Sequence, residues 1–232
     1  MKTILNTAIA ATIGLAVVSC GGSKSSPAPA SNTPTTKIEL SGQAIKGTID
    51  KGEVFVFRAN NLVNPVAAAV STDALGNYTF TLDEATSYKG AYIIEVVAAA
   101  GTTMICDAKP MCGDVDFGDK IPADKLTGLS LSSVTTVDET GKAKANVNLL
   151  TTLTTDVLIT AAKADGVNLS SVSKETLDKL QMISSEIVGD LIGVDLSTKN
   201  VFDIEVVDAT TYTANSTPDV TIDTLSVINA SY

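Results

Sequence analysis

The chain has 232 residues, and its 26 acidic and 16 basic residues give a net charge of −10. Arg58 is the only arginine, so the clustered cations that bind nucleic acids and anionic lipids are missing. Histidine and tryptophan are absent, which excludes Ser-His and Cys-His nucleophile pairs, His-ligated metals and the strongest aromatic stacking platform.

The N-terminal segment has the shape of a secretory signal. Lys2 precedes a short apolar run over residues 4–18, and small residues lead from that run into a cysteine. The alternative is a signal-anchor helix, but the run is shorter than the ~20 apolar residues that a membrane span needs. We therefore expect residues 1–19 to be a signal peptide.

The residues around the expected cleavage site carry a resemblance to a known family. Val17-Val18-Ser19-Cys20 resembles the lipobox of bacterial lipoproteins. In that family the cysteine thiol is diacylated, the preceding peptide is cleaved and the new N-terminus is acylated. The resemblance implies that Cys20 is the lipidation site, and Gly21 fits sorting to the outer membrane because lipoproteins retained elsewhere carry aspartate there.

Residues 20–36 contain no large apolar side chain. Such a segment cannot bury enough surface to fold, so we expect a lipidated, disordered tether. Its 16 residues after Cys20 give an r.m.s. reach of about 20–25 Å, enough to space a folded body away from a membrane.

From residue 37 to residue 117 the pattern predicts β-structure. Residues 53–58 and 91–97 are rich in β-branched and aromatic side chains, and apolar residues alternate with threonines over 78–82. Asp73 and Gly76 occupy the first and last positions of a predicted turn between strands. Short strands separated by turns favour an antiparallel β-sandwich.

This region also resembles a carboxypeptidase-regulatory-like domain, through residues 41–47, 54–56 and 72–80. The resemblance covers about residues 38–100. It implies an Ig/prealbumin-like sandwich that serves as a noncatalytic module, often on exported proteins, and it supplies no catalytic residue.

Two cysteines remain once Cys20 carries lipid. Cys106 and Cys112 form an even pair in an oxidising compartment, so we predict a structural disulfide. A loop this short gains about 2 kcal/mol from the cross-link. The alternatives are a redox pair, which lacks the C-x-x-C spacing, and a thiolate metal site, which lacks further ligands.

Three aspartates follow the cysteines and invite a calcium interpretation: Asp114, Asp116 and Asp119. Alternating acids with a glycine begin EF-hand loops. Here Phe117-Gly118 falls where a ligand is needed, and Lys125 occupies the twelfth position, which requires a glutamate. We therefore expect solvated loop acids and neither a metal nor a cofactor, with these three residues as the candidate ligands if calcium binds.

Further strands are expected at 128–137 and 143–147, so the sandwich domain with its strand extension is predicted to cover residues 37–147. Leu129, Leu131 and Val134 are expected to face inward. A turn over residues 138–141 connects the first of these strands to a return strand.

After residue 147 the apolar period becomes helical, which predicts a helical pair over residues 148–196. The first apolar face comprises Leu150, Leu153, Val157, Ala161 and Ala164. Ser173 is the expected N-cap of the second helix, and Gly193 its stop. The second face comprises Leu177, Leu180, Ile183, Ile187 and Leu191.

Residues 197–232 begin as a polar loop and then start a new apolar pattern at Ile222, Leu225, Val227 and Ile228. Either a short element docks back on the body, or the chain is a piece of something longer.

Several short motifs match those of enzymes or sugar-binding sites, but each also has a structural explanation. Ser171 and Lys174 match S-x-x-K of penicillin-recognising enzymes, but S-D-N and K-T-G are missing. The acid pairs 83–84 and 138–139 are adjacent rather than set across a cleft, and we expect solvated turn acids. Sugar stacking on Tyr78, Tyr88 or Tyr92 competes with core packing, which we favour.

The sequence thus predicts a mainly β protein with an α-helical C-terminal part. We expect a noncatalytic, outer-membrane-anchored lipoprotein of the bacterial cell envelope that presents its sandwich for binding, adhesion or scaffolding. Its expected partners are the membrane, through the lipid, and an envelope protein or glycan. The alternatives are an accessory domain or fragment of a periplasmic or surface enzyme, and a glycan-binding module.

Overall fold

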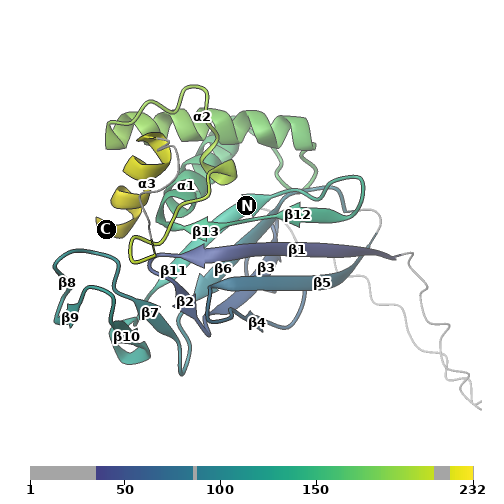
Figure 1. Ribbon diagram of the computed structural model, residues 1–232. Helices are drawn as coiled ribbons and strands as arrows, with labels where there is room; N and C mark the ends of the chain where they lie inside the picture. The colour runs from purple at the N-terminus through teal and green to yellow at the C-terminus, as the bar shows by residue number, and fades with distance from the viewer. Residues whose placement is uncertain (1–34, 86–87, 212–219, 232) are drawn as a thin grey trace, which may run out of the picture. The chain divides into compact units, whose positions relative to one another are not determined.

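The computed structural model describes residues 35–85, 88–211 and 220–231 (Figure 1). The predicted signal peptide, Cys20 and nearly all of the predicted tether lie outside these residues.

Two sheets form the main body. In the first, β1 is paired antiparallel with β5 on one edge and parallel with β12 and β13 on the other: β1 is Thr35–Ile45, β5 Asn77–Ala85, β12 Lys142–Lys144 and β13 Val147–Asn148. The second sheet is antiparallel throughout, in the order β11 (Ser130–Thr135), β6 (Tyr92–Val97), β3 (Glu53–Arg58), β4 (Val70–Ser71).

Smaller elements gather at one end of the sandwich. A three-stranded sheet has the order β10 (Lys120–Pro122), β7 (Thr103–Ile105), β2 (Ile49–Asp50). A hairpin of β8 (Met111–Cys112) and β9 (Val115–Asp116) projects between β7 and β10, and the short helix η1 (Ala123–Lys125) follows β10.

The core between the sheets comes from strand alternation. Phe80 and Leu40 lie opposite each other in the first sheet, and Val56 lies opposite Ile94 in the second; all four are at most 2% exposed. Asp73 accepts backbone N–H bonds from Leu75 and Asn77, so the predicted turn before β5 is confirmed. The fold is a β-sandwich followed by helices, as the sequence predicts.

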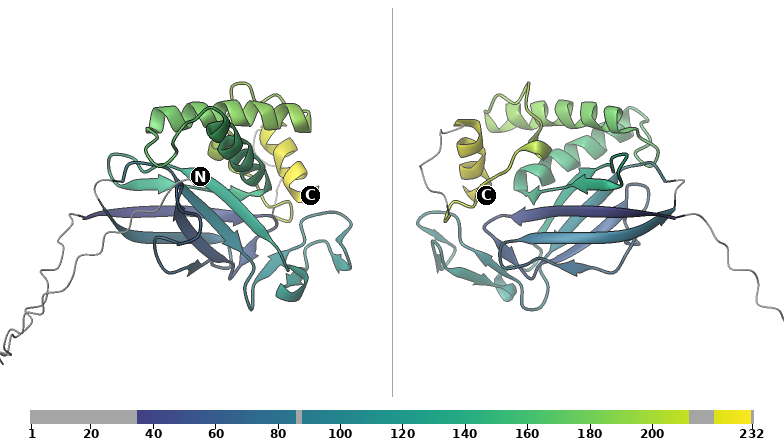
Figure 2. Two further views of the ribbon diagram at one scale, coloured as in Figure 1. Left: turned by 180° about the vertical axis from the view of Figure 1, so that it is seen from behind. Right: turned by 45° about the vertical axis from the view of Figure 1, so that its right-hand side comes forward.

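Two helices cover the outer face of the second sheet, α1 (Leu149–Ala164) and α2 (Lys174–Ile192) (Figures 1 and 2). Phe57, Ile93 and Val134 of that face pack against Leu158 and Leu177 in a second apolar cluster. Ser173 caps α2 and Gly193 ends it in the left-handed conformation, so both predicted boundaries are confirmed.

The chain then continues through the short helix η2 (Val201–Asp203) to a third helix, α3 (Val220–Ser231). Leu225 of α3 is fully buried with Ile45 and Leu150 in a third cluster. Asn229 accepts the Leu149 N–H and donates to the Ile45 carbonyl. The apolar pattern near the C-terminus therefore belongs to an element that docks on the body.

Residues 142–148 correct one expectation. They do not form a return strand beside β11; β12 and β13 pair with β1, in parallel and at one constant register. Val134 also differs from the prediction, because it faces the helices whereas Leu131 faces the sandwich core.

The predicted helix faces are partly wrong. The side chains that α1 buries include Thr151, Thr154 and Thr155 beside Leu150 and Leu158. In α2, the buried set includes Gln181, Ser184 and Ser185, whereas three residues predicted to face the core are exposed: Ile183, Ile187 and Leu191. Both helices are rotated away from their most apolar stripe.

Candidate functional site

A covalent cross-link shapes the hairpin at one end of the sandwich. The sulfurs of Cys106 and Cys112 lie 2.16 Å apart, with their Cα atoms 5.6 Å apart. The Cys106 N–H donates to the Asp119 carbonyl, so the base of the hairpin is closed by a backbone bond as well. This arrangement presents Met111 and Phe117 from a constrained loop.

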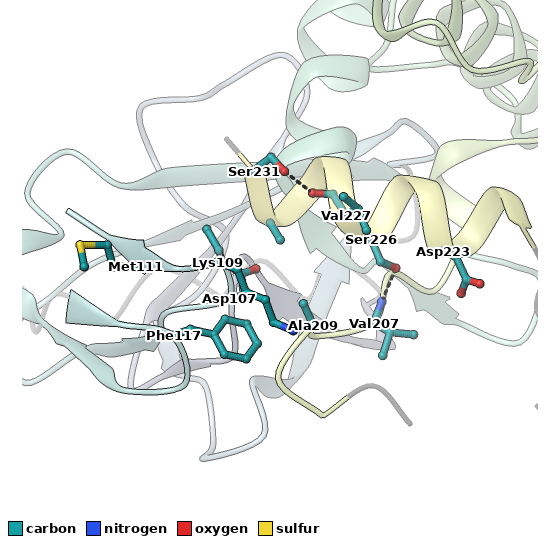
Figure 3. A pocket seen from close by; sticks show the side chains of 12 residues that line it. Asp107, Lys109, Met111, Phe117, Val207, Ala209, Asp223, Ser226, Val227 and Ser231 are labelled. Carbon is teal, nitrogen blue, oxygen red and sulfur yellow. Dashed lines mark hydrogen bonds between the residues drawn. The ribbon is translucent and has the colours of Figure 1, made fainter. Parts of the chain in front are cut away.

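Between this hairpin and α3 lies a cleft of about 650 Å³ (Figure 3). Phe117 and Met111 line it from the hairpin, and Val227 and Ala230 line it from α3. Val207, from the segment after η2, completes the apolar wall, and its N–H donates to the Ser226 hydroxyl. The volume falls within the range of small-molecule sites, which are concave and mostly apolar.

A buried ion pair lies at this site. Asp107 is one of the residues that line the cleft, and its side chain is 2% exposed. Its Oδ2 accepts the Gly47 N–H at 2.6 Å, and its Oδ1 lies 3.7 Å from Lys46 Nζ. Lys46 Nζ donates to the Ala230 carbonyl of α3 at 3.0 Å. The pair therefore joins the end of β1, the start of the hairpin loop and α3.

Burial dominates the electrostatics of this pair. It raises the pKa of Asp107, although nearby Lys46 opposes the shift. It also lowers the pKa of Lys46, although Asp107 opposes that shift. Both directions show that removing the two charges from water outweighs their mutual attraction at 3.7 Å.

A second aspartate holds the segment that leads towards α3. Asp208 is buried, and its Oδ2 accepts from the backbone N–H and the hydroxyl of Thr48. Its Oδ1 accepts from the N–H and hydroxyl of Thr210. Val207 and Ala209, which flank Asp208 in the chain, are thereby fixed as cleft walls.

The rim of the cleft carries charges of both signs. Lys109 extends beside the Phe117 ring, with its Nζ 4.9 Å from the ring centroid, and Asp223 lies on α3 (Figure 3). Met111 and Val227 are 48% and 62% exposed. Apolar walls with charged edges suit a molecule or peptide segment that has an apolar body and polar ends.

The three candidate calcium ligands do not come together. Asp114 receives two bonds of 2.5 Å from Lys125 Nζ, which lowers the pKa of Asp114, and Asp116 and Asp119 are exposed. Within residues 35–85, 88–211 and 220–231 no three or more His, Cys, Asp or Glu residues form a set that could hold a metal ion.

A different polar cluster lies inside the sandwich and corrects the interpretation of Glu84 as a solvated turn acid. Glu84 is on β5 and 3% exposed; it forms a salt bridge with Arg58 and accepts the Tyr92 hydroxyl at 3.1 Å. Burial raises the pKa of Tyr92. Arg58 also lies over the Tyr88 ring, 5.2 Å from its centroid.

Two of the three tyrosines considered for sugar stacking are buried in the core. Tyr78 and Tyr92 are 3% and 1% exposed, and Tyr88 is half-buried with its hydroxyl bonded to the Ala91 carbonyl. Core packing is therefore confirmed for Tyr78 and Tyr92.

The remaining motifs have structural roles. Lys174 forms a salt bridge with Asp178 one helical turn on, and Ser171 precedes the Ser173 cap of α2. Asp138 accepts the N–H groups of Thr140 and Lys142 and so stabilises its own turn. The S-x-x-K segment is thus a helix start.

Comparison with known proteins adds little. A scan against protein-family models and a search of curated proteins found no match. The chain is similar to a solved "putative cell adhesion protein" from Bacteroides eggerthii DSM 20697, with 16% identity and a TM-score of 0.29. That match covers 50% of this chain and 40% of the other, and at this TM-score it supports no inference about function. Among the helices that the structure describes, none has the length and apolar character of a membrane span.

Sequence reasoning missed the cleft because its walls are distant in the chain. Lys46 lies 61 positions from Asp107 and 184 positions from Ala230, and no local pattern marks these residues. The cysteine spacing and the apolar residues of α3 can be seen in the sequence. Each of them marks one wall of the cleft, but neither indicates that the two walls meet.

Proposed function

We propose that the protein is a noncatalytic lipoprotein of the bacterial cell envelope that binds a ligand in the cleft between the disulfide hairpin and α3. The observation that carries the binding role is the cleft, whose walls are held by Asp107, Asp208 and the Cys106–Cys112 cross-link. Sites built on such constrained elements lose little entropy when a ligand binds.

Anchoring at the outer membrane through Cys20 is the second part of this proposal. It rests on the lipobox resemblance and on the apolar segment that precedes it. The β-sandwich is compatible with the resemblance to noncatalytic carboxypeptidase-regulatory-like modules. Together these features favour a domain that is held near a membrane and presents a binding surface.

Metabolic labelling with palmitate tests the anchor. We expect the wild-type protein to incorporate label and to partition into detergent, and Cys20→Ser to do neither, because the serine lacks the thiol that is acylated. A Cys20→Ser protein that still labels and remains membrane-bound would refute lipidation at this residue.

Site-specific photocrosslinking in intact cells tests the cleft. A photoreactive residue at Val227, which is 62% exposed in the cleft, should give a discrete adduct. The matched control is Val63, which is 85% exposed and lies outside the cleft. Equal labelling at both positions, or none at Val227, would contradict a binding role for the cleft.

A further inference from the structure

Helix α2 carries an exposed ridge of apolar side chains on the side opposite its packing contacts. Ile183, Ile187 and Leu191 follow one another at intervals of four residues and are 53%, 47% and 75% exposed. Residues four apart lie on one face of a helix, so the three side chains form a continuous row. Isolated exposed apolar residues need no explanation, but a row of three branched ones does.

The orientation of α2 is fixed by specific contacts on its other side. Gln181 Nε2 donates to the Val134 carbonyl at 2.9 Å, and the Ser185 hydroxyl accepts the Val201 N–H at 3.0 Å. A Cβ at Gly189 would lie 2.5 Å from the Val194 carbonyl oxygen, so the helix approaches the following loop closely at that point. The outward ridge is therefore a consequence of how α2 is held.

Charges at the two ends of the ridge are opposite. The row begins, one turn earlier, with Lys179, and the exposed Asp190 lies beside its C-terminal end. Neither residue forms a salt bridge within the part of the chain that the structure describes. The carbonyl end of α2 adds a partial negative charge near Asp190.

We propose that the ridge is a dimer contact, covered by α2 of a second copy of this chain running antiparallel. A twofold axis between Ile183 and Ile187 places Ile183 of each copy opposite Ile187 of the other. The same axis brings each Lys179 to the Asp190 of the second copy and to the negative end of its helix.

The charges favour this partner over others. A parallel helix pair would set like charges side by side at each end of the ridge. An anionic lipid surface is disfavoured by Glu186 and Asp190, which flank the row. The twofold axis also sets the Glu186 side chains of the two copies near each other, and this like-charge contact limits the affinity of the dimer. The 19 residues of α2 extend about 28 Å, so the contact is of the small, reversible kind. The proposal does not depend on the cleft.

Sedimentation equilibrium of the full chain in density-matched detergent, at about 0.15 M salt, tests the dimer through charge reversal. Lys179→Asp and Asp190→Lys alone should each weaken the dimer by at least tenfold, because each places like charges together across the axis. The double variant should recover to within about threefold of wild type, because the two pairs are restored with reversed polarity. A general effect of net charge would shift the two single variants in opposite directions, so weakening in both of them, followed by recovery in the double variant, identifies the specific pairs.

Ile187→Asp tests the apolar part, with Leu75→Asp as its matched control, since Leu75 is 65% exposed in a turn remote in the chain from α2. We expect Ile187→Asp to abolish association and Leu75→Asp to leave it within twofold of wild type, with unchanged circular dichroism for both. A wild-type chain that stays monomeric up to about 1 mM overturns the proposal. So does a double charge variant that is no better than the single ones.

Discussion

Replacing Asp107 with alanine removes the carboxylate that joins three parts of the cleft. In the folded protein its Oδ2 holds the Gly47 N–H and its Oδ1 faces the Lys46 ammonium at 3.7 Å. Alanine leaves a buried amide without an acceptor and a largely buried cation without a counter-ion. The loss in the free energy of unfolding is therefore larger than the net stabilisation that the two contacts provide.

The magnitude follows from these two orphaned groups. An unpaired buried amide costs about 1–3 kcal/mol. Breaking a fully buried ion pair costs roughly 3–5 kcal/mol. Lys46 is 12% exposed and keeps its bond to the Ala230 carbonyl, so leaving this residue without a counter-ion costs less than that. We expect a total of about 3 kcal/mol. For a chain of this size that lowers Tm by about 6–12 °C.

Urea titration and thermal melting, both followed by circular dichroism, measure this change. The control is Asp223→Ala, a half-buried cleft aspartate for which we expect a change below ~0.5 kcal/mol. Adding Lys46→Met to Asp107→Ala should recover part of the loss, because the orphaned charge is gone. A loss below ~1 kcal/mol in Asp107→Ala, or strict additivity in the double variant, would show that the pair does not stabilise the fold as reasoned.

Three further predictions concern pH, the cross-link and domain dependence. Because the pKa of Asp107 is raised in the folded protein, the folded state binds a proton on this carboxyl group more tightly than the unfolded state does. The stability that this proton binding provides is fully present below the usual pKa of 3.8 and is lost as the pH rises through the raised pKa. The stability of wild type relative to Asp107→Asn, measured by urea titration, should fall from pH 3.5 towards neutrality; a constant difference would contradict this. Alkylation of the unfolded, unreduced mature protein should leave Cys106 and Cys112 unlabelled, and ready labelling of both would show that they are not bonded. A fragment of residues 148–232 should show little stable helix by circular dichroism, because its helices bury their apolar side chains against strand residues that the fragment lacks. Without those partners they bury too little surface to offset the ordering entropy of ~1–2 kcal/mol per residue, and a cooperative helical melt would contradict this.

Local patterns in the sequence predict the elements well. Strand alternation over 78–82 identifies the buried side of β5, and the turn before it follows from Asp73 and Gly76. Capping residues also set the ends of α2, since a serine cap and a glycine stop act through neighbouring backbone groups. Each of these signals is local, and each is confirmed.

Which face of a helix turns inward is not a local property. Periodicity shows that α1 has an apolar stripe, but the structure buries threonines as well. Thr151 completes a capping box with Asn148 and donates to the Ser132 carbonyl, and Thr154 donates to the Leu150 carbonyl. Satisfied in this way, hydroxyl groups can be buried at little cost, so the hydrophobic stripe does not decide the rotation. The pairing of β12 with β1 was missed for a similar reason, because it joins residues about a hundred positions apart.

The helical layer also changes what the sandwich needs in order to fold. A carboxypeptidase-regulatory-like module would use one face of each sheet, yet the second sheet here is apolar on both. Phe57, Ile93 and Val134 form its outer patch, and Leu158 and Leu177 of the helices cover that patch. Exposing three such side chains would cost roughly 1.5–3 kcal/mol each, which is a large part of the stability of a typical domain. The predicted boundary at residue 147 therefore divides the chain by secondary structure, while the packing requires the sandwich and helices to stabilise each other.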